Sequence, residues 1–314
     1  MLTSNPKIDG STTSVTTLLN NLPKTNPTAY SIKGTIALPD WFGFSYHLQG
    51  VAPYNGTAGN SIMNGCITGS STVGYFLDFT ENGTDQPTVS AVTQPDANYY
   101  HAAGIQMLGD ILPVPLESDK SGYGAKVAFY DVSQLANPRF LYNLPMPVQP
   151  SGSKAAKASA VAVTTYTDAS NVEQALLAVY QYDPRHLYFF KAVASSLETG
   201  ANAWTLLATY TGSALDGDQF QSFAMVTQAA AGTADQIYLM GFREDEELHL
   251  YTVSLTSSSV SLTAVKTYTG WKGSDWRNGV GLQIYNPTTL RIFGTDKDPS
   301  GSSTNYTIKV FVWK

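Results

Sequence analysis

The strongest constraint in this sequence is a repeat of about 56 residues, in which a complete unit holds four short apolar runs separated by polar turns. The first run of successive units begins at residues 45, 101, 157, 221 and 277, at intervals of 56, 56, 64 and 56 residues. Four short strands repeated at such a period are typical of the blades of a β-propeller. The long third interval contains Ala192–Ala203, which has the character of an insertion.

The third run of each unit is the most strand-like, because it is dense in aromatic and β-branched residues that suit a pleated surface. These runs are Val73–Phe79, Lys126–Asp131, His186–Lys191, Leu248–Val253 and Tyr306–Trp313. A polar turn precedes each of them, and a further apolar run precedes each turn. Fourth strands are expected at Thr88–Gln94, Phe140–Met146, Trp204–Tyr210 and Val260–Tyr268.

The last unit has no fourth run of its own, and the run Ser31–Leu38 near the N-terminus has no unit. Pairing the two completes one blade from both ends of the chain and removes a free sheet edge. The sequence therefore predicts an all-β fold, a β-propeller of about five blades whose last blade is closed by an N-terminal strand. We expect one propeller domain over residues 31–314 and an N-terminal extension over 1–30. Within the extension, Val15–Leu22 fits either a short packed helix or a frayed tail.

Composition excludes several classes of function. The net charge is −6 and the isoelectric point is near 5.1, which argues against a nucleic-acid-binding protein. No apolar run reaches the roughly 18 residues of a membrane span. The single cysteine, Cys66, excludes an intramolecular disulfide framework and a cysteine-based zinc site. The expected partner is a small-molecule ligand, and the composition leaves the oligomeric state open.

The first residues, Met1–Pro6, lack the basic and apolar segments of a signal peptide, which predicts a cytoplasmic protein for the chain as it stands. Only 13% of the residues are charged, against about 25% in a typical soluble domain. Such a Ser- and Thr-rich surface would also suit an extracellular protein.

In a propeller the first strand of each blade lies innermost, and the loops at one mouth of the central channel build the site. The polar or aromatic residues in or beside these strands are His47, Gln49, Tyr100, His101, Gln106, Lys157, Ser159, Gln221, Ser222, Trp276, Arg277, Asn278 and Gln283. The only acid beside them is Asp275, so the axis is expected to be neutral to basic. This predicts a site for an anionic or oxygen-rich small molecule. Alternatively, the same groups hydrogen-bond to water trapped in the channel.

Two motifs place an imidazole close to a glutamine amide and a glycine. They are His47-Leu48-Gln49-Gly50 and His101-Ala102-Ala103-Gly104-Ile105-Gln106. Histidine titrates near neutral pH, so a positioned pair can serve as acid and base. With the following Leu112–Glu117, the motifs resemble those of a group of uncharacterised, mostly bacterial, predicted β-propeller proteins. The resemblance covers mainly residues 44–131, and it implies the fold and a polar site around His47, Gln49, His101, Gln106 and Glu117, without a known substrate.

Two functions remain open from the sequence. In the first, His47 and His101 are catalytic groups of a lyase, isomerase or cyclase. The expected substrate-binding residues are Gln49, Tyr100, Gln106, Lys157, Gln221, Trp276, Arg277, Asn278 and Gln283, with Lys157 or Arg277 holding an anionic group. The alternative is a lectin-like, carbohydrate-binding propeller without catalysis. Because the blades diverge and the polar residues cluster in the first two and the last, one central site is favoured, and with it the enzyme.

Other chemistries are less favoured. Glycoside hydrolysis needs a pair of carboxylates, whereas the inner strands lack Asp and Glu and Asp183-Pro184-Arg185 falls in an expected hairpin turn. No cofactor is predicted; a metal held by His47, His101 and Glu117 is a minor alternative, because no spacing enforces it. A serine nucleophile is not favoured, since no Gly-x-Ser-x-Gly elbow is present.

Overall fold

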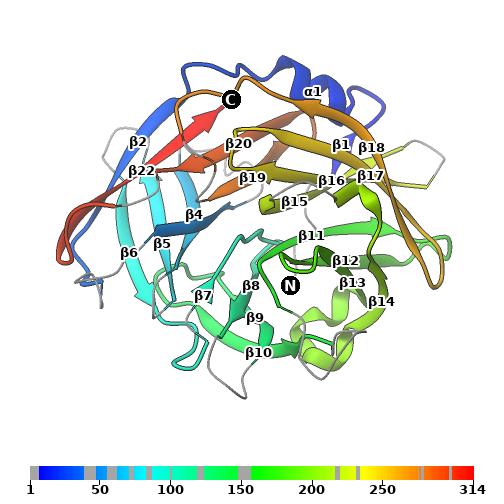
Figure 1. Ribbon diagram of the computed structural model, residues 1–314, viewed down its shortest axis with the longest axis horizontal. Helices are drawn as coiled ribbons and strands as arrows, with labels where there is room; N and C mark the ends of the chain where they lie inside the picture. Colours follow the sequence, from blue (N-terminus) through cyan, green and yellow to red (C-terminus); the bar gives the residue numbers. More distant parts are fainter. Residues whose placement is uncertain are drawn as a thin grey trace.

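The computed structural model describes residues 7–38, 47–54, 62–70, 74–82, 87–99, 101–118, 124–147, 157–215, 220–230, 234–274, 276, 279–296 and 299–314. Regular structure in these ranges is almost entirely β-strand. The strands form a ring around one axis (Figure 1). The fold is thus all-β, a β-propeller of about five blades. In the described ranges no helix has the length and apolar character needed to span a bilayer.

The described strands pair into five antiparallel groups, which we number as blades 1 to 5. Blade 1 contains β3 (His47–Pro53), β4 (Ile62–Ser70), β5 (Tyr75–Asn82) and β6 (Thr88–Thr93). Blade 2 contains β7 (His101–Ala102), β8 (Ile111–Glu117), β9 (Ala125–Asp131) and β10 (Arg139–Pro145). Blade 3 contains β11 (Ala160–Thr167), β12 (Glu173–Gln181), β13 (His186–Val193) and β14 (Thr205–Tyr210).

Blade 4 contains β15 (Phe220–Ala229), β16 (Gln236–Arg243), β17 (Leu248–Leu255) and β18 (Val260–Tyr268). Blade 5 contains β19 (Val280–Asn286), β20 (Thr289–Thr295), β22 (Asn305–Trp313) and β2 (Thr28–Gly34), with β21 (Ser300–Ser302) paired to β22. The expected insertion forms short 3-10 helices at Ala194–Thr199 and Ala201–Ala203, and a third lies at Ser213–Leu215. The order of strands agrees with the repeat read from the sequence.

The N-terminal strand closes the last blade, as predicted. All seven residues of β2 pair antiparallel with β22, from Thr28 opposite Val312 to Gly34 opposite Tyr306 (Figure 1, β2 in blue and β22 in red). The strand lies at Thr28–Gly34 instead of the expected Ser31–Leu38. Leu38 instead donates its backbone N–H to the carbonyl of Ser303. Ring closure therefore joins segments from opposite ends of the sequence.

Ahead of β2, Val15–Asn21 forms helix α1. Ser14 caps the helix by accepting a hydrogen bond from the N–H of Thr17. Before it, β1 (Ile8–Asp9) pairs in parallel with the end of β15, while the Asp9 N–H donates to the carbonyl of Pro287. The packed-helix alternative is the one that the structure shows, and this segment ties blade 4 to blade 5.

The inner run of blade 2 also departs from the expected strands. A strand was expected over residues 101–108, but only His101–Ala102 pair with β8. Two prolines in β8, Pro113 and Pro115, lack the N–H groups that a longer ladder would need. The run instead turns toward blade 3, where the N–H of Val161 donates to the carbonyl of Gly104 at 2.9 Å.

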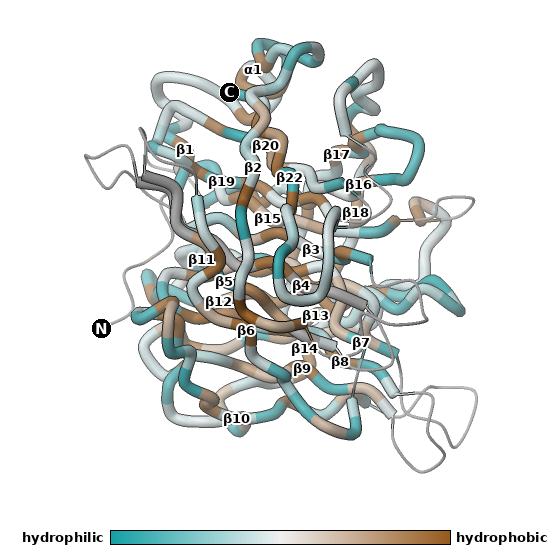
Figure 2. The backbone as a smooth tube through the Cα atoms, turned by 90° about the vertical axis from the view of Figure 1, so that its left-hand side faces the viewer, coloured by the Kyte–Doolittle hydropathy of each residue, from teal (hydrophilic) through white to brown (hydrophobic). Residues whose placement is uncertain are grey.

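The hydrophobic core lies between neighbouring blades. Five clusters of buried side chains fill the interfaces 1–2, 2–3, 3–4, 4–5 and 5–1. Figure 2 shows the hydrophobic stretches gathered along the strands and the hydrophilic ones in the connecting loops. Each blade therefore depends on both neighbours to bury its two faces.

Inner strands approach one another so closely that only glycine fits at some positions. A Cβ built on Gly281 of β19 would lie 1.8 Å from the carbonyl oxygen of Val51 in β3. We expect Gly281→Ala to lower the free energy of unfolding by about 1–3 kcal/mol, because β19 and β3 must separate. Urea unfolding measures this change, with the exposed Ser257→Ala as control. Equal stability of the two variants would contradict close packing at the axis.

A buried carboxyl group adds a pH-dependent contribution to stability. Asp78 of β5 is fully buried, and no described residue gives its carboxylate oxygens a hydrogen bond. Burial raises the pKa of Asp78 from 3.8 to about 7, although weaker polar interactions with its own backbone and with Ser90 act in the opposite direction. The folded protein therefore holds a proton that the unfolded chain releases near pH 4. Its contribution to stability is complete below that pH and is lost as the pH rises toward 7.

We expect Asp78→Asn to gain stability relative to the wild type as the pH is raised from 4 to 7. The gain over that interval is on the order of 4 kcal/mol, since each pKa unit is worth about 1.4 kcal/mol. Urea unfolding of both proteins at pH 4, 5.5 and 7 measures the difference. A difference in stability that stays constant with pH would show that Asp78 does not titrate in this interval.

Candidate functional site

A cavity of about 320 Å³, which we call the mouth cavity, lies where the inner strands begin. Its lining residues are His47, Gln49, His101, Glu117, Lys157, Ser159, Tyr182, Asp183, Phe220 and Gln221. They come from blades 1 to 4. His47, His101 and Phe220 are the first residues of β3, β7 and β15. The inner strands thus deliver their first side chains to one end of the channel.

The mouth cavity brings together five of the predicted site residues. They are His47, Gln49, His101, Lys157 and Gln221. Glu117, which was considered as a metal ligand and as part of the polar site implied by the resemblance, lies in the same lining. Tyr100, Arg277 and Asn278, which were also predicted to belong to the site, lie outside the described residues.

A short polar network holds His101 in place. His101 and Glu117 are direct cross-strand partners in β7 and β8, with 3.7 Å between Nδ1 and Oε2. The Ser159 hydroxyl donates a 2.8 Å hydrogen bond to the other carboxylate oxygen, Oε1. The backbone N–H of Tyr182 donates to the Ser159 oxygen at 3.3 Å. One carboxylate therefore connects the inner edges of blades 2 and 3.

Glu117 is mostly buried, yet it favours the ionised form. Burial raises its pKa, but the polar interaction with His101, the hydrogen bond from Ser159 and the charge of Lys157 outweigh burial and leave the pKa lowered. At neutral pH Glu117 is therefore an anion that orients the imidazole of His101. It is not a proton donor.

Three predicted substrate-binding residues lie outside the lining of the mouth cavity. Gln106 is buried, and its amide bonds only to backbone: Oε1 accepts from the N–H groups of Val163 and Met225, and Nε2 donates to the Met225 carbonyl. Its side chain thus clamps blades 2, 3 and 4 together across the axis. Gln283 likewise donates to the carbonyl of Tyr54, joining blade 5 to the end of β3.

Trp276 is the third of these residues. It was expected to rim the channel mouth, but it is fully buried between blades 4 and 5. Its ring centroid lies 5.3 Å from that of Trp271 and 5.8 Å from that of Trp313. An indole in this position packs the core, which is the commoner role of a large aromatic residue.

Three lining residues were not among the predicted site residues: Tyr182, Asp183 and Phe220. Tyr182 and Asp183 lie in the turn between β12 and β13, which was correctly expected to be a hairpin. Because strands alternate in direction, the turn between the second and third strands of a blade lies at the end where the first strand begins. This rule would have placed Asp183 at the mouth. The inner strands lack acids, as read from the sequence, but Glu117 and Asp183 reach the mouth cavity from second strands and the turn after them.

The metal alternative gains no support from the geometry. His47, His101 and Glu117 all line the mouth cavity. Nevertheless, among the residues that the structure describes, no group of three or more His, Cys, Asp or Glu side chains is arranged to hold a metal ion. The arrangement is suited instead to hydrogen bonding and proton transfer.

Comparison with known proteins yields structural likeness only. No family model matches this sequence, and no curated protein matches it. A GH62 hydrolase crystallised with xylotriose matches over 92% of this chain and 99% of its own, with 9% identity and a TM-score of 0.48. The catalytic domain of a GH62 α-L-arabinofuranosidase from Coprinopsis cinerea matches over 92% and 97%, with 13% identity and a TM-score of 0.49.

A family 117 glycoside hydrolase, Zg3597, from the marine bacterium Zobellia galactanivorans covers 90% of each chain, with 8% identity and a TM-score of 0.47. At such identities and TM-scores, these likenesses do not bear on the activity of this chain. The resemblance to uncharacterised propeller proteins likewise stays a prediction.

Substitution of two glutamines of the predicted site tests which of them stabilises the fold and which is available to a ligand. We expect Gln106→Ala to destabilise the fold by at least about 2 kcal/mol, because three buried backbone groups lose their partner. Gln49→Ala, at a half-buried position in the cavity lining, should leave the unfolding midpoint unchanged within about 0.5 kcal/mol. Urea unfolding of the two variants decides between these roles. If the Gln106→Ala protein is as stable as Gln49→Ala, the hydrogen bonds of Gln106 do not hold blades 2, 3 and 4 together.

Proposed function

We propose that the mouth cavity binds a small polyhydroxylated molecule of the carbohydrate class and that His101, oriented by Glu117, acts there as acid and base. The observation that carries the proposal is the ionised Glu117 between His101 and Ser159 at the edge of the cavity. A carboxylate beside an imidazole fixes the ring and stabilises its protonated form.

The composition of the lining supports an oxygen-rich ligand over a simple anion. The amides of Gln49 and Gln221 and the hydroxyl of Ser159 offer both donors and acceptors. The Tyr182 and Phe220 rings provide apolar faces for the C–H face of a sugar. Lys157 is balanced by two carboxylates, Glu117 and Asp183, so the cavity does not carry the basic excess that the sequence indicated.

Proton transfer follows from the arrangement of the side chains. His101, paired with Glu117, takes a proton from a ligand hydroxyl or from a carbon beside a carbonyl group. His47, from the neighbouring blade, is the candidate for returning a proton on another side of the ligand. Such a pair serves a lyase or an isomerase, in which a proton leaves one atom and is delivered to another.

The test combines ligand binding and turnover in one sample. Wild-type protein is mixed with cellobiose, lactose, xylobiose or maltose, and saturation-transfer NMR reports which disaccharide binds, while new anomeric or vinyl signals report turnover. We expect His101→Gln and Glu117→Gln to keep the binding constant within a few-fold. Turnover should fall by at least roughly 100-fold, as is usual when an acid–base group is lost.

His249→Gln serves as the matched control. This imidazole lies outside the mouth cavity, with Nε2 3.2 Å from Glu247 Oε2. Its variant should keep both binding and turnover. Binding of a disaccharide without turnover would overturn the catalytic part and favour a lectin-like protein. Absence of binding by the whole panel, together with unchanged thermal unfolding of all variants, would overturn the proposal as a whole.

A further inference from the structure

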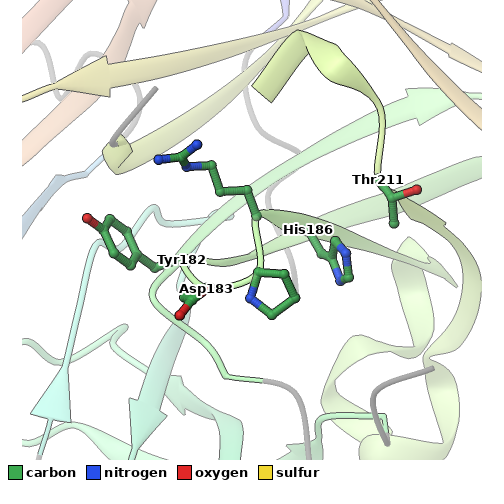
Figure 3. Close-up of a pocket in the computed structure, with 6 residues that line it drawn as sticks. Tyr182, Asp183, His186 and Thr211 are labelled. Atoms are coloured by element: carbon green, nitrogen blue, oxygen red, sulfur yellow. The ribbon is translucent and has the colours of Figure 1, made fainter. Parts of the chain in front are cut away.

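A second cavity adjoins the mouth cavity on the far side of the turn between β12 and β13. It has a volume of about 420 Å³ and is lined by Tyr182, Asp183, Pro184, Arg185, His186 and Thr211. Tyr182 and Asp183 line both cavities, so the turn is a shared wall. Figure 3 shows Tyr182 and His186 on opposite sides of the turn, with Asp183 between them. A ligand that extends from the mouth cavity past this wall would enter the second cavity.

The second cavity contains a cation, Arg185, that forms no ion pair with any residue the structure describes. Arg185 is half-buried, and the described residues give its guanidinium neither an ion pair nor a hydrogen bond. A guanidinium presents five N–H donors in a planar fork that matches carboxylate or sulfate oxygens. Because no described residue occupies these N–H donors, the Arg185 guanidinium can bind an anionic group of a ligand.

The neighbouring groups add neutral donors. The Nδ1 atom of His186 lies 3.5 Å from the hydroxyl oxygen of Tyr188. Burial lowers the pKa of His186, so the imidazole is neutral at pH 7 and can donate one hydrogen bond. Thr211 brings a hydroxyl from the segment after β14. The single carboxylate, Asp183, belongs to the wall shared with the mouth cavity and repels an anion from that side, which directs it toward Arg185.

We propose that the second cavity is a subsite for an anionic substituent of the ligand, a carboxylate or a sulfate group, held by Arg185. This inference rests on the proposed function and narrows its ligand class to acidic carbohydrates, such as uronic acids or sulfated sugars. The sugar ring occupies the mouth cavity, and the charged group passes the Asp183 wall. Arg185 is then a specificity-determining residue that takes no part in proton transfer.

The experiment compares matched ligands by calorimetry. The neutral disaccharides of the panel are titrated beside cellobiouronate, as the carboxylate probe, and cellobiose 6-sulfate, as the sulfate probe. We expect at least one acidic probe to bind wild-type protein 10-fold or more tightly than cellobiose. Arg185→Gln should remove that preference and leave the affinity for cellobiose unchanged. Arg139→Gln, an arginine on β10 outside both cavities, is the matched control and should keep the preference.

A second measurement tests the subsite without a sugar. Sodium sulfate and sodium acetate are added separately to ¹⁵N-labelled protein, and the Nε–H signals of the five arginines are followed by NMR. We expect the signal that disappears in Arg185→Gln to shift in a saturable way with the anion of the preferred probe.

The outcomes separate this inference from the proposed function. If cellobiose and the acidic probes bind with equal affinity and the Arg185 signal shows no saturable shift, the anionic subsite is overturned. The proposal that the mouth cavity binds a carbohydrate is then unaffected. A saturable anion shift without binding of any sugar supports the subsite and overturns the carbohydrate ligand. Preference for an acidic probe that persists in Arg185→Gln assigns the recognition to another cation and overturns the role of Arg185.

Discussion

The pairing of β2 with β22 is the interaction on which the ring depends. Blades bury both faces against their neighbours, and the cluster between blades 5 and 1 includes Ile32 of β2 together with Leu48 and Ile67 of blade 1. An open ring would leave these side chains in water and expose the free edge of β22. The mouth cavity takes residues from four blades, so its geometry exists only while the ring is closed.

Closure also determines where a ligand can bind. The inner strands are packed against each other through backbone contacts, as at Gly281 and Val51, and the Gln106 side chain occupies the space between blades 2, 3 and 4. Further along, Thr164 and Thr227 hydrogen-bond across the interface of β11 and β15. With the axis filled by protein in this way, polar side chains that begin the inner strands are open to a ligand, whereas those in the middle hold the blades together.

This distinction explains which site residues could be predicted. The spacing of the repeat located the starts of the inner strands, and His47, His101, Lys157 and Gln221 at those starts do meet in one cavity. Gln106 and Gln283 lie farther along the inner runs of blades 2 and 5 and bond to the main chain of other blades. Sequence patterns could not separate the cavity-lining residues from those that bond between blades. How many residues of an inner run stay open to the cavity depends on how tightly the inner strands pack, and this packing is not visible in the sequence. Trp276 was misplaced because an indole suits a core and a ligand surface equally well.

The acids of the site require a different kind of inference. Glu117 ends a second strand and Asp183 follows one, and the alternation of strand direction returns both to the end where the first strands begin. A reading of inner strands alone therefore underestimates the negative charge of a propeller mouth, as it does here. With Glu117 ionised beside His101 and Asp183 in the shared wall, the mouth cavity is close to electrically balanced and favours hydroxyl groups. Arg185, for which the described residues supply no partner, lines the second cavity on the other side of Asp183. Under the proposed function, the turn therefore separates a region for a neutral ring from a region for an anion.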